Sequence, residues 1–436
     1  MNNLIAFLFV LIGFLTCFTS RQVCLAGGQE QSAAGTILSW GDCLAEAEKN
    51  HPDLISAAEG INIKKAGRDV TASGLYPQFS ASVGASTAQT STASAGKSTS
   101  DSYSYGIDGS QLIFDGFKTV NDLKAADEDI NVAWQSYRFT SAQVRRDLRG
   151  AFINLLKAQE LIKVAEEIVN IRRDNLMLLT MQYQAGLEHK GALLTAEANA
   201  AEANFGLAQA KRSAEFAQIK LTQEMGRREF VPLSVKGEFV AQETAAEKPD
   251  FEQLAKSNPA VLEAAAQKNS ALFAVKSAFG NFAPQLSGTA GADRKSAHWP
   301  PENNQWDLGL SLTLPLFEGG LKAAQLSSAQ AVYRQKEADE RSARDTALVT
   351  LEQTWAALRD AIGTVDVQDK LLEAAEERAQ IAEAQYSTGF ISFDNWVIIE
   401  NDLVKAKKSY LQSQADALLA EADWIQAKGE TLEYAR

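Results

Sequence analysis

Apolar and polar residues alternate one by one in two separate parts of the chain, which predicts β-strands with one apolar and one polar face. The apolar positions of these runs lie within Phe79–Ala85, Tyr103–Ile107, Leu286–Ala292 and Trp306–Leu314. A stretch rich in Ser, Thr, Ala and Gly, Gln89–Ser102, separates the first two runs, and a loop is expected between the last two at Arg294–Gln305. The sequence therefore predicts two β-hairpins, either in a membrane barrel with a wet interior or in a half-buried sheet of a soluble domain.

A seven-residue period replaces this alternation after each hairpin. From Phe117 to Gln184 there is no proline and one internal glycine, Gly150. Apolar residues recur at every seventh position, at Leu148, Leu155, Ile162, Val169 and Leu176, and again at Leu351, Leu358, Val365, Leu372 and Ala379. The positions four residues upstream, such as Ala151, Ala158 and Ala165, are mostly small. This pattern predicts long helices of about 68 residues, roughly 100 Å each, that pack as in a coiled coil.

Glycines mark the ends of the helices that follow. Gly186 and Gly389 each end a long helix at a turn, and a second helix returns from each turn to Gly226 or Gly429. A left-handed glycine explains such abrupt stops. Shorter helical stretches are expected before the hairpins, at about Ser39–Ser73 and Phe251–Asn281.

The same order of elements occurs twice because the sequence is duplicated. His51-Pro52 and Asn258-Pro259 are 207 residues apart, and later motifs, such as those ending at Gly186 and Gly389, are 203 residues apart. So long a period does not fit a solenoid, so we interpret the chain as two fused copies of one large element. The predicted organisation is a signal peptide at 1–26, a first repeat at 27–226, a linker at 227–250, a second repeat at 251–429 and a C-terminal tail at 430–436.

The N-terminus predicts export. Leu4–Phe18 is an apolar run that is short for a membrane span, and Cys24-Leu25-Ala26 offers small residues to a signal peptidase. We expect a cleaved signal peptide, with an uncleaved anchor or lipidation of Cys17 or Cys24 as alternatives. Cys43 then remains alone and has no partner for an internal disulfide. No later segment approaches 18 consecutive apolar residues, so no membrane-spanning helix is expected.

Composition and charge exclude several classes of function. A net charge of −13 argues against a nucleic-acid partner, which needs a basic face. His51, His189 and His298 fall in three different predicted elements, so neither a metal site nor a catalytic triad is expected. Met177 and Met181 are interpreted as packing residues. No cofactor is predicted, and the lack of a convergent polar constellation argues against an enzyme.

Four strands per chain are too few to close a membrane barrel. The smallest barrels need about 8 strands, and the open edges of a four-stranded sheet are too costly in lipid. We therefore expect an oligomer of two or three chains. Trp299 and Trp306 flank the second hairpin loop and fit the aromatic girdle of a barrel or, equally, a capped hairpin end.

In the order, duplication and spacing of its motifs the sequence resembles the TolC-like outer-membrane efflux proteins over about Ile37–Gly429. The pieces that carry the resemblance are Leu44-Ala45-Glu46-Ala47 before Asn50-His51-Pro52, Tyr76-Pro77-Gln78, Ala283-Pro284-Gln285, Leu312-Thr313-Leu314-Pro315-Leu316-Phe317 before Gly319-Gly320, and Tyr386-Ser387-Thr388-Gly389-Phe390-Ile391-Ser392. The resemblance implies a mainly α fold with a β-barrel portion, built from two tandem repeats with four transmembrane β-strands per chain. It implies a homotrimer, a 12-stranded barrel in the outer membrane and a helical tunnel in the periplasm. Arg227–Asp250 and the chain ends would form an equatorial collar.

The resemblance also implies a function and partners. Such a protein passively conducts cargo to the exterior from a periplasmic adaptor and an inner-membrane RND or ABC pump, in contact with outer-membrane lipid. The tips expected to meet the adaptor are Gly186, Leu187, Gly389 and Phe390. The alternative is a structural periplasmic coiled-coil or adhesion protein. Whether the cargo is a drug, a metal ion or a polypeptide is not encoded in this chain, because substrate choice usually lies with the pump.

Well-known members of the family narrow the tunnel entrance with two aspartates, six and nine positions after the second turn glycine. Asn395 and Ile398 stand at those positions here, so that pair is absent. Four nearby carboxylates are the candidate pore or gate residues: Asp394, Glu400, Asp402 and Glu197. The alternative for each is a solvated helix surface or an ordinary ion pair. A three-fold ring of such carboxylates favours cations.

Overall fold

The computed structural model describes residues 36–92, 96–239 and 248–435. The predicted signal peptide at 1–26, with Cys17 and Cys24, lies outside the described residues. Contacts divide the chain into Met1–Thr36 and Ile37–Arg436, and the second unit is described below. Its elements are β1 (Thr36–Leu38, shared with the first unit), α2 (Trp40–Asn50), α3 (Pro52–Ser73), β2 (Gln78–Thr92), β3 (Gly96–Phe114), α4 (Lys118–Gln184), α5 (Lys190–Glu224), β4 (Leu233–Val235), α6 (Phe251–Ser257), α7 (Pro259–Gly280), β5 (Gln285–Ser296), β6 (Asn303–Thr313), α8 (Leu321–Ser387), α9 (Phe393–Ala427) and η1 (Leu432–Ala435).

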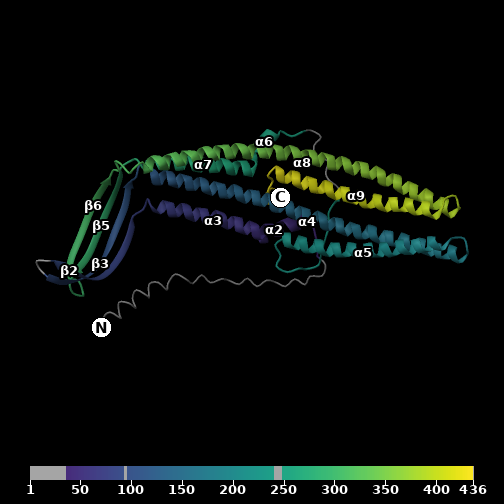
Figure 1. The fold of residues 1–436 in the computed structure, drawn as a ribbon, viewed down its shortest axis with the longest axis horizontal. Coiled ribbons are helices and arrows are strands. Elements are labelled where there is room, and N and C mark those ends of the chain that lie inside the picture. Colours follow the sequence, from purple (N-terminus) through teal and green to yellow (C-terminus); the bar gives the residue numbers. More distant parts are fainter. Residues whose placement is uncertain (1–35, 93–95, 240–247, 436) are drawn as a thin grey trace. The chain divides into compact units, whose positions relative to one another are not determined.

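The predicted duplication is confirmed as two matching sets of elements (Figure 1). The series α2, α3, β2, β3, α4, α5 corresponds to the series α6, α7, β5, β6, α8, α9. Helices α4 and α8 each have 67 residues, and α5 and α9 each have 35. Helix α5 packs along α4, and α9 packs along α8, so that each pair forms a helical hairpin. The first hairpin (α4 and α5) touches the second (α8 and α9) where α4 packs on α9.

One antiparallel sheet joins the two repeats. It lies at the end of the long helices α4 and α8 that is opposite their turns at Gly186 and Gly389. Its strand order is β2-β3-β5-β6, and the central pairing of β3 with β5 sets Ile107 opposite Ala292. One face is strongly apolar and exposed: Val83, Trp306, Leu308 and Leu310 keep 76, 81, 78 and 76% of their surface. Within the described residues β2 and β6 each leave one edge unpaired.

The strands extend further than the alternation predicts. Strand β2 continues to Thr92 and β3 begins at Gly96, so most of the polar stretch Gln89–Ser102 belongs to strands. The loop predicted at Arg294–Gln305 also shrinks, because β5 ends at Ser296 and β6 begins at Asn303. Small polar residues show no alternation of apolar and polar positions, so the sequence pattern does not mark them as strands. Their backbones nevertheless pair regularly across the hairpin.

The short helical stretch predicted before each hairpin is two helices rather than one. The breaks fall at His51 and Asn258, and each precedes a proline. Proline disfavours helical backbone in the residue before it but fits the first position of the next helix. Each break residue caps that next helix: His51 Nδ1 accepts from the N–H of Asp53 at 3.2 Å, and Asn258 Oδ1 accepts from the N–H of Ala260 at 2.9 Å.

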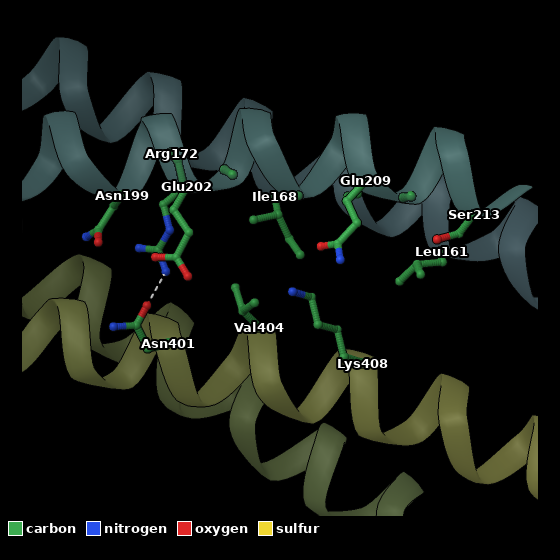
Figure 2. A pocket seen from close by; sticks show the side chains of 14 residues that line it. Leu161, Ile168, Arg172, Asn199, Glu202, Gln209, Ser213, Asn401, Val404 and Lys408 are labelled. Carbon is green, nitrogen blue, oxygen red and sulfur yellow. Dashed lines mark hydrogen bonds between the residues drawn. The ribbon is translucent and has the colours of Figure 1, made fainter.

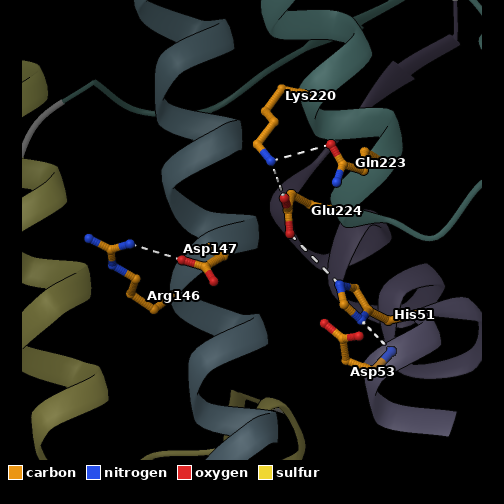
Figure 3. A network of polar contacts seen from close by, with 7 residues as sticks. All are labelled: His51, Asp53, Arg146, Asp147, Lys220, Gln223 and Glu224. Carbon is orange, nitrogen blue, oxygen red and sulfur yellow. Dashed lines mark hydrogen bonds and ion pairs between the residues drawn. The ribbon is translucent and has the colours of Figure 1, made fainter. Parts of the chain in front are cut away.

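The return helix of each repeat ends against this break. Gly226 and Gly429 are left-handed, with φ of 74° and 77°, as predicted. A Cβ added to Gly226 would lie 2.3 Å from the carbonyl oxygen of the residue before His51. Beside this contact Glu224 lies between Lys220, 2.8 Å from its Oε1, and His51 Nε2, 3.7 Å from its Oε2 (Figure 3). At position 226 only glycine allows the chain to come so close to the carbonyl oxygen before His51 in a left-handed backbone conformation.

The seven-residue stripe forms the cores of the helical hairpins. Leu148, Leu155, Leu351 and Leu358 have no exposed surface, which confirms the predicted stripe in both repeats. Burial of each leucine stabilises the fold by about 1.5–3 kcal/mol. The buried residues of α5 are mostly alanine, which lets its backbone approach α4 closely.

The end of the chain packs on α4. Leu432 of η1 is buried, and its N–H donates to Ser141 Oγ at 3.1 Å. Glu433 Oε1 accepts from the hydroxyl of Tyr137 at 2.9 Å. The segment predicted as a tail at 430–436 therefore includes a docked 3-10 helix.

Candidate functional site: contacts between the two helical hairpins

A polar link joins the two helical hairpins where α4 meets α9. Arg172 Nη1 lies 2.6 Å from Glu400 Oε2. Its Nη2 lies 2.6 Å from Asn401 Oδ1 (Figure 2). Asn175 Nδ2 donates to the same Glu400 oxygen at 2.6 Å. The Arg172 and Glu400 side chains are only 6 and 12% exposed. Because removing one partner leaves the other charge buried and uncompensated, this link strongly couples the hairpins.

The surroundings of Glu400 shift its protonation. Burial raises the pKa of Glu400 above its usual value, and the hydrogen bond from Asn175 and the charge of Arg172 oppose this increase only in part. Glu400 therefore takes up a proton at a higher pH than an exposed glutamate does. The link is a charge pair above that pH and loses the charge on Glu400 below it.

A groove of about 360 Å³ lies beside this link, between α4, α5 and α9 (Figure 2). Leu161 and Ile168 give it an apolar floor, while Glu202, Gln209 and Lys408 supply polar side chains. No histidine or cysteine lines it. The groove therefore offers a surface of mixed character between the hairpins.

A second link lies closer to the turns. The Tyr386 hydroxyl of α8 lies 2.7 Å from Gln182 Oε1 at the end of α4 and 3.0 Å from Glu188 Oε1 in the turn that follows. Its ring stacks on Trp396, with centroids 4.5 Å apart. Burial, and then the hydrogen bond to Glu188, raise the pKa of Tyr386 well above its usual range, so the phenol stays protonated as a donor.

The four predicted gate carboxylates occupy different surroundings. Glu400 is largely buried in the link to Arg172, and Asp402 lies 3.5 Å from Arg378 on a half-exposed surface. Asp394 is exposed in the first turn of α9, and Glu197 is exposed on α5. The structure therefore does not bring the four together within one chain.

The predicted adaptor-facing tips are exposed turns. Leu187 and Phe390 keep 78 and 83% of their surface. Gly186 and Gly389 are left-handed, and no atom lies within 4 Å of a Cβ built on either. Their left-handed conformation reverses the chain, and the N–H groups of Leu187 and Phe390 donate back to the carbonyl oxygens of Gln182 and Gln385 at 2.9 and 2.8 Å.

Arg172 and Tyr386 were missed as site residues in the sequence. Arg172 meets a residue 228 positions away, and nothing local marks it. Tyr386 belongs to a repeated motif, but its counterpart Tyr183 makes no such contact with the other hairpin in the described chain. Their role depends on the packing of one hairpin against the other.

Two features are absent from residues 36–92, 96–239 and 248–435. No helix there is both long and apolar enough to cross a membrane. No group of three or more His, Cys, Asp or Glu side chains there has the arrangement of a metal site.

Comparison with known proteins places this fold. The family model described as "Outer membrane efflux protein" matches residues 43–227 and 251–430. The chain is 21% identical over 413 residues to the outer membrane efflux protein BepC of Brucella suis, covering 91% of this chain and 88% of BepC. It is 23% identical over 386 residues to the probable outer membrane lipoprotein SilC of Salmonella typhimurium, covering 84 and 80% of the two chains.

Solved structures of outer-membrane channels have the same fold. The crystal structure of CusC has a TM-score of 0.81 at 17% identity, covering 92% of this chain and 95% of that one. The CmeC outer membrane channel of Campylobacter jejuni has a TM-score of 0.78 at 17% identity, covering 93 and 90%. Repeated helical hairpins on a four-stranded sheet with an exposed apolar face thus define an outer-membrane channel fold. The chain belongs to the outer membrane efflux protein family, which confirms the predicted family and outer-membrane location.

Proposed function

We propose that this protein is the homotrimeric exit duct of a tripartite efflux or type I secretion system. The observation that carries the proposal is the four-stranded sheet, which has one exposed apolar face and two unpaired edges. Three copies of the sheet close a barrel of 12 strands and bury every edge, as lipid requires. Family membership favours this duct over the alternative of a periplasmic coiled-coil or adhesion protein. The duct conducts passively and needs no cofactor or catalytic group.

The helical hairpins form the periplasmic tunnel, and their turns meet the adaptor. Leu187 and Phe390 present exposed apolar side chains at these turns, and such side chains are suited to a protein contact. The described parts of the 227–250 linker, residues 227–239 and 248–250, form the equatorial collar together with β1 and η1; residues 240–247 of the linker lie outside the described residues. An inner-membrane pump of the RND or ABC class supplies cargo through the adaptor.

The contacts between the hairpins control the tunnel entrance. The Arg172–Glu400 and Tyr386–Glu188 contacts tie the second hairpin to the first, and loosening them lets the hairpins separate. Among the predicted carboxylates, Asp394 and Glu197 have no ion-pair partner within the described chain, so they are the stronger candidates to face permeating ions. Glu400 acts as part of the link, and Asp402 as a surface ion pair.

The proposal is tested by membrane fractionation and by mass measurement in detergent. We expect the processed protein in the outer-membrane fraction and a particle of three chains that heat dissociates. A soluble periplasmic protein, or a monomer in mild detergent, would contradict the duct.

A further inference from the structure

Three aromatic side chains gather at the end of the sheet that lies away from the helices. Strand β5 follows α7 closely and runs to Ser296, so the loop between β5 and β6 is at this far end. The ring centroid of Trp299 in this loop lies 6.4 Å from that of Tyr103 and 6.3 Å from that of Tyr105. Half of the Trp299 surface stays exposed. We call these three residues the aromatic cluster.

Arg294 lies on the same face of the sheet as the aromatic cluster. Residues that pair across an antiparallel sheet point to the same face, and Arg294 pairs with Tyr105 on β3 and with Asn304 on β6. The preceding residue of this face on β5 is Ala292, which pairs with Trp306. Arg294 therefore stands on the exposed apolar face, as the first charged residue beyond its apolar band.

The position of Arg294 along β5 is that of a membrane interface. The apolar band on β5 and β6 extends from the pair Leu286–Leu312 to the pair Ala292–Trp306, which is about 20 Å of strand. A membrane barrel has an apolar band of about 25 Å with aromatic residues at both borders, and the amphipathic rings of Trp and Tyr sit at the level of the lipid headgroups. Since the helical tunnel is periplasmic, the far end of the sheet meets headgroups of the outer leaflet.

The charge of Arg294 has no counter-charge within the described residues. Its guanidinium makes no ion pair or hydrogen bond with them, and the hydroxyls of Tyr103 and Tyr105 and the indole N–H of Trp299 make no hydrogen bond with them either. An unpaired arginine on a lipid-facing strand is strongly unfavourable at the middle of a bilayer and is tolerated near the interface. All four side chains offer hydrogen-bond donors, so together they suit an anionic oxygen group.

We infer that Arg294 and the aromatic cluster bind the phosphate group of an anionic lipid in the outer leaflet. The planar guanidinium matches a phosphate with two parallel N–H donors, and the phenol and indole groups add further donors. The acyl chains lie along the adjoining apolar face, over Trp306 and Leu308, and this continuity favours a lipid headgroup over free phosphate. The inference rests on the proposed insertion of the sheet in the outer membrane and adds a ligand site that conduction does not require.

The first hairpin lacks this site. Thr87 and Asp101 are the counterparts of Arg294 and Asn304, 207 and 203 positions back. The Thr87 hydroxyl donates to Asp101 Oδ1 at 2.7 Å, and the carboxylate of Asp101 repels a phosphate. We therefore expect one bound lipid per chain, on the second hairpin.

Lipid titration followed by native mass spectrometry tests the site. The purified protein in mild detergent is titrated with phosphatidylglycerol or with zwitterionic phosphatidylcholine, and the bound lipids are counted per chain. The wild type should retain one phosphatidylglycerol per chain in preference to phosphatidylcholine. Arg294→Gln should lower the affinity for phosphatidylglycerol by about 10-fold, because a charge-assisted hydrogen bond to the phosphate is lost.

Lys295→Gln is the matched control for Arg294→Gln. It removes the same charge one residue along β5, from the polar face, where Lys295 pairs with Ser104 and Asn303. Its affinity for phosphatidylglycerol should stay at the wild-type value. Tyr105→Phe is a second variant, because the hydroxyl that it removes makes no hydrogen bond with the described residues. It should keep the wild-type thermal midpoint and bind phosphatidylglycerol more weakly.

The outcomes separate this inference from the proposed function. Equal loss of affinity in Arg294→Gln and Lys295→Gln, or no loss in either Arg294→Gln or Tyr105→Phe, overturns the lipid site and leaves the duct standing. Displacement of phosphatidylglycerol by millimolar inorganic phosphate shows a site for a free anion and also overturns the lipid site. A protein that stays soluble without detergent and binds no lipid overturns both the duct and the site.

Discussion

At the residue scale, the link between Arg172 and Glu400 is expected to determine how firmly the two helical hairpins hold together. We expect Glu400→Ala to weaken the contact between the hairpins by about 3 kcal/mol, because it leaves Arg172 and Asn175 buried without the carboxyl oxygen that accepts from both. In planar bilayers this variant should conduct more than the wild type, and its thermal midpoint should be lower. Glu167→Gln is the matched control, because it breaks an exposed ion pair between the same helices, worth at most about 1 kcal/mol. Equal effects of the two changes would contradict the special role of the buried link.

The raised pKa of Glu400 predicts a pH dependence. The carboxylate is ionised above its raised pKa and becomes neutral as pH falls through it, at a pH higher than the ordinary 4.5. The linked hairpins, in which this pKa is raised by burial, bind the proton more tightly than separated hairpins with an exposed Glu400, so conductance of the wild type should fall as pH falls through that window. Glu400→Gln has no carboxyl group to titrate there and should lack the step. Identical pH profiles for the two proteins would rule Glu400 out as the titrating group.

Asp394 is predicted to act on ions rather than on the link. It is exposed in the first turn of α9 and has no ion pair in the described chain. We expect Asp394→Asn to lower the preference for cations in reversal-potential measurements without changing thermal stability. Asp402→Asn, at a carboxylate already paired with Arg378, serves as the control. Unchanged ion preference in Asp394→Asn would remove this residue from the pore.

At the element scale, each return helix ends at a left-handed glycine that packs against the break before a proline. Gly226→Ala is expected to destabilise the protein by the left-handed strain of about 1–2 kcal/mol and, further, by a clash, because its Cβ would lie 2.3 Å from a backbone oxygen. Gly186→Ala carries the same strain with no atom within 4 Å. Thermal unfolding of the two variants measures the difference. Equal loss of stability would show that the close approach is unimportant.

The elements were predictable where a period is strong. Leu148 and Leu155 stand on the seven-residue stripe, so the long helices and their core follow from the sequence. The breaks at His51 and Asn258 were missed because the prolines that cause them were read as part of one helical stretch. The serine- and threonine-rich ends of β2 and β3 were missed because small polar residues carry no alternation.

At the scale of the whole molecule, the sequence predicts the architecture better than the site. Duplication, strand count and helix length lead to the family. The links at Arg172 and Tyr386 depend on which faces of two helices meet across more than 190 residues of chain. The periodicity of apolar residues does not show how each helix is rotated toward the other hairpin. The sequence therefore predicts gate residues only from the carboxylates near the turns.

Conductance of the purified trimer in a planar bilayer tests the central claim most directly. An exit duct should give discrete ion-conducting steps, small in the wild type and larger in Glu400→Ala combined with Tyr386→Phe, where both links between the hairpins are removed. Comparison with this variant distinguishes a channel that is closed in the wild type from a protein that forms no channel. If the inserted trimer conducts in neither form, the protein is not a duct.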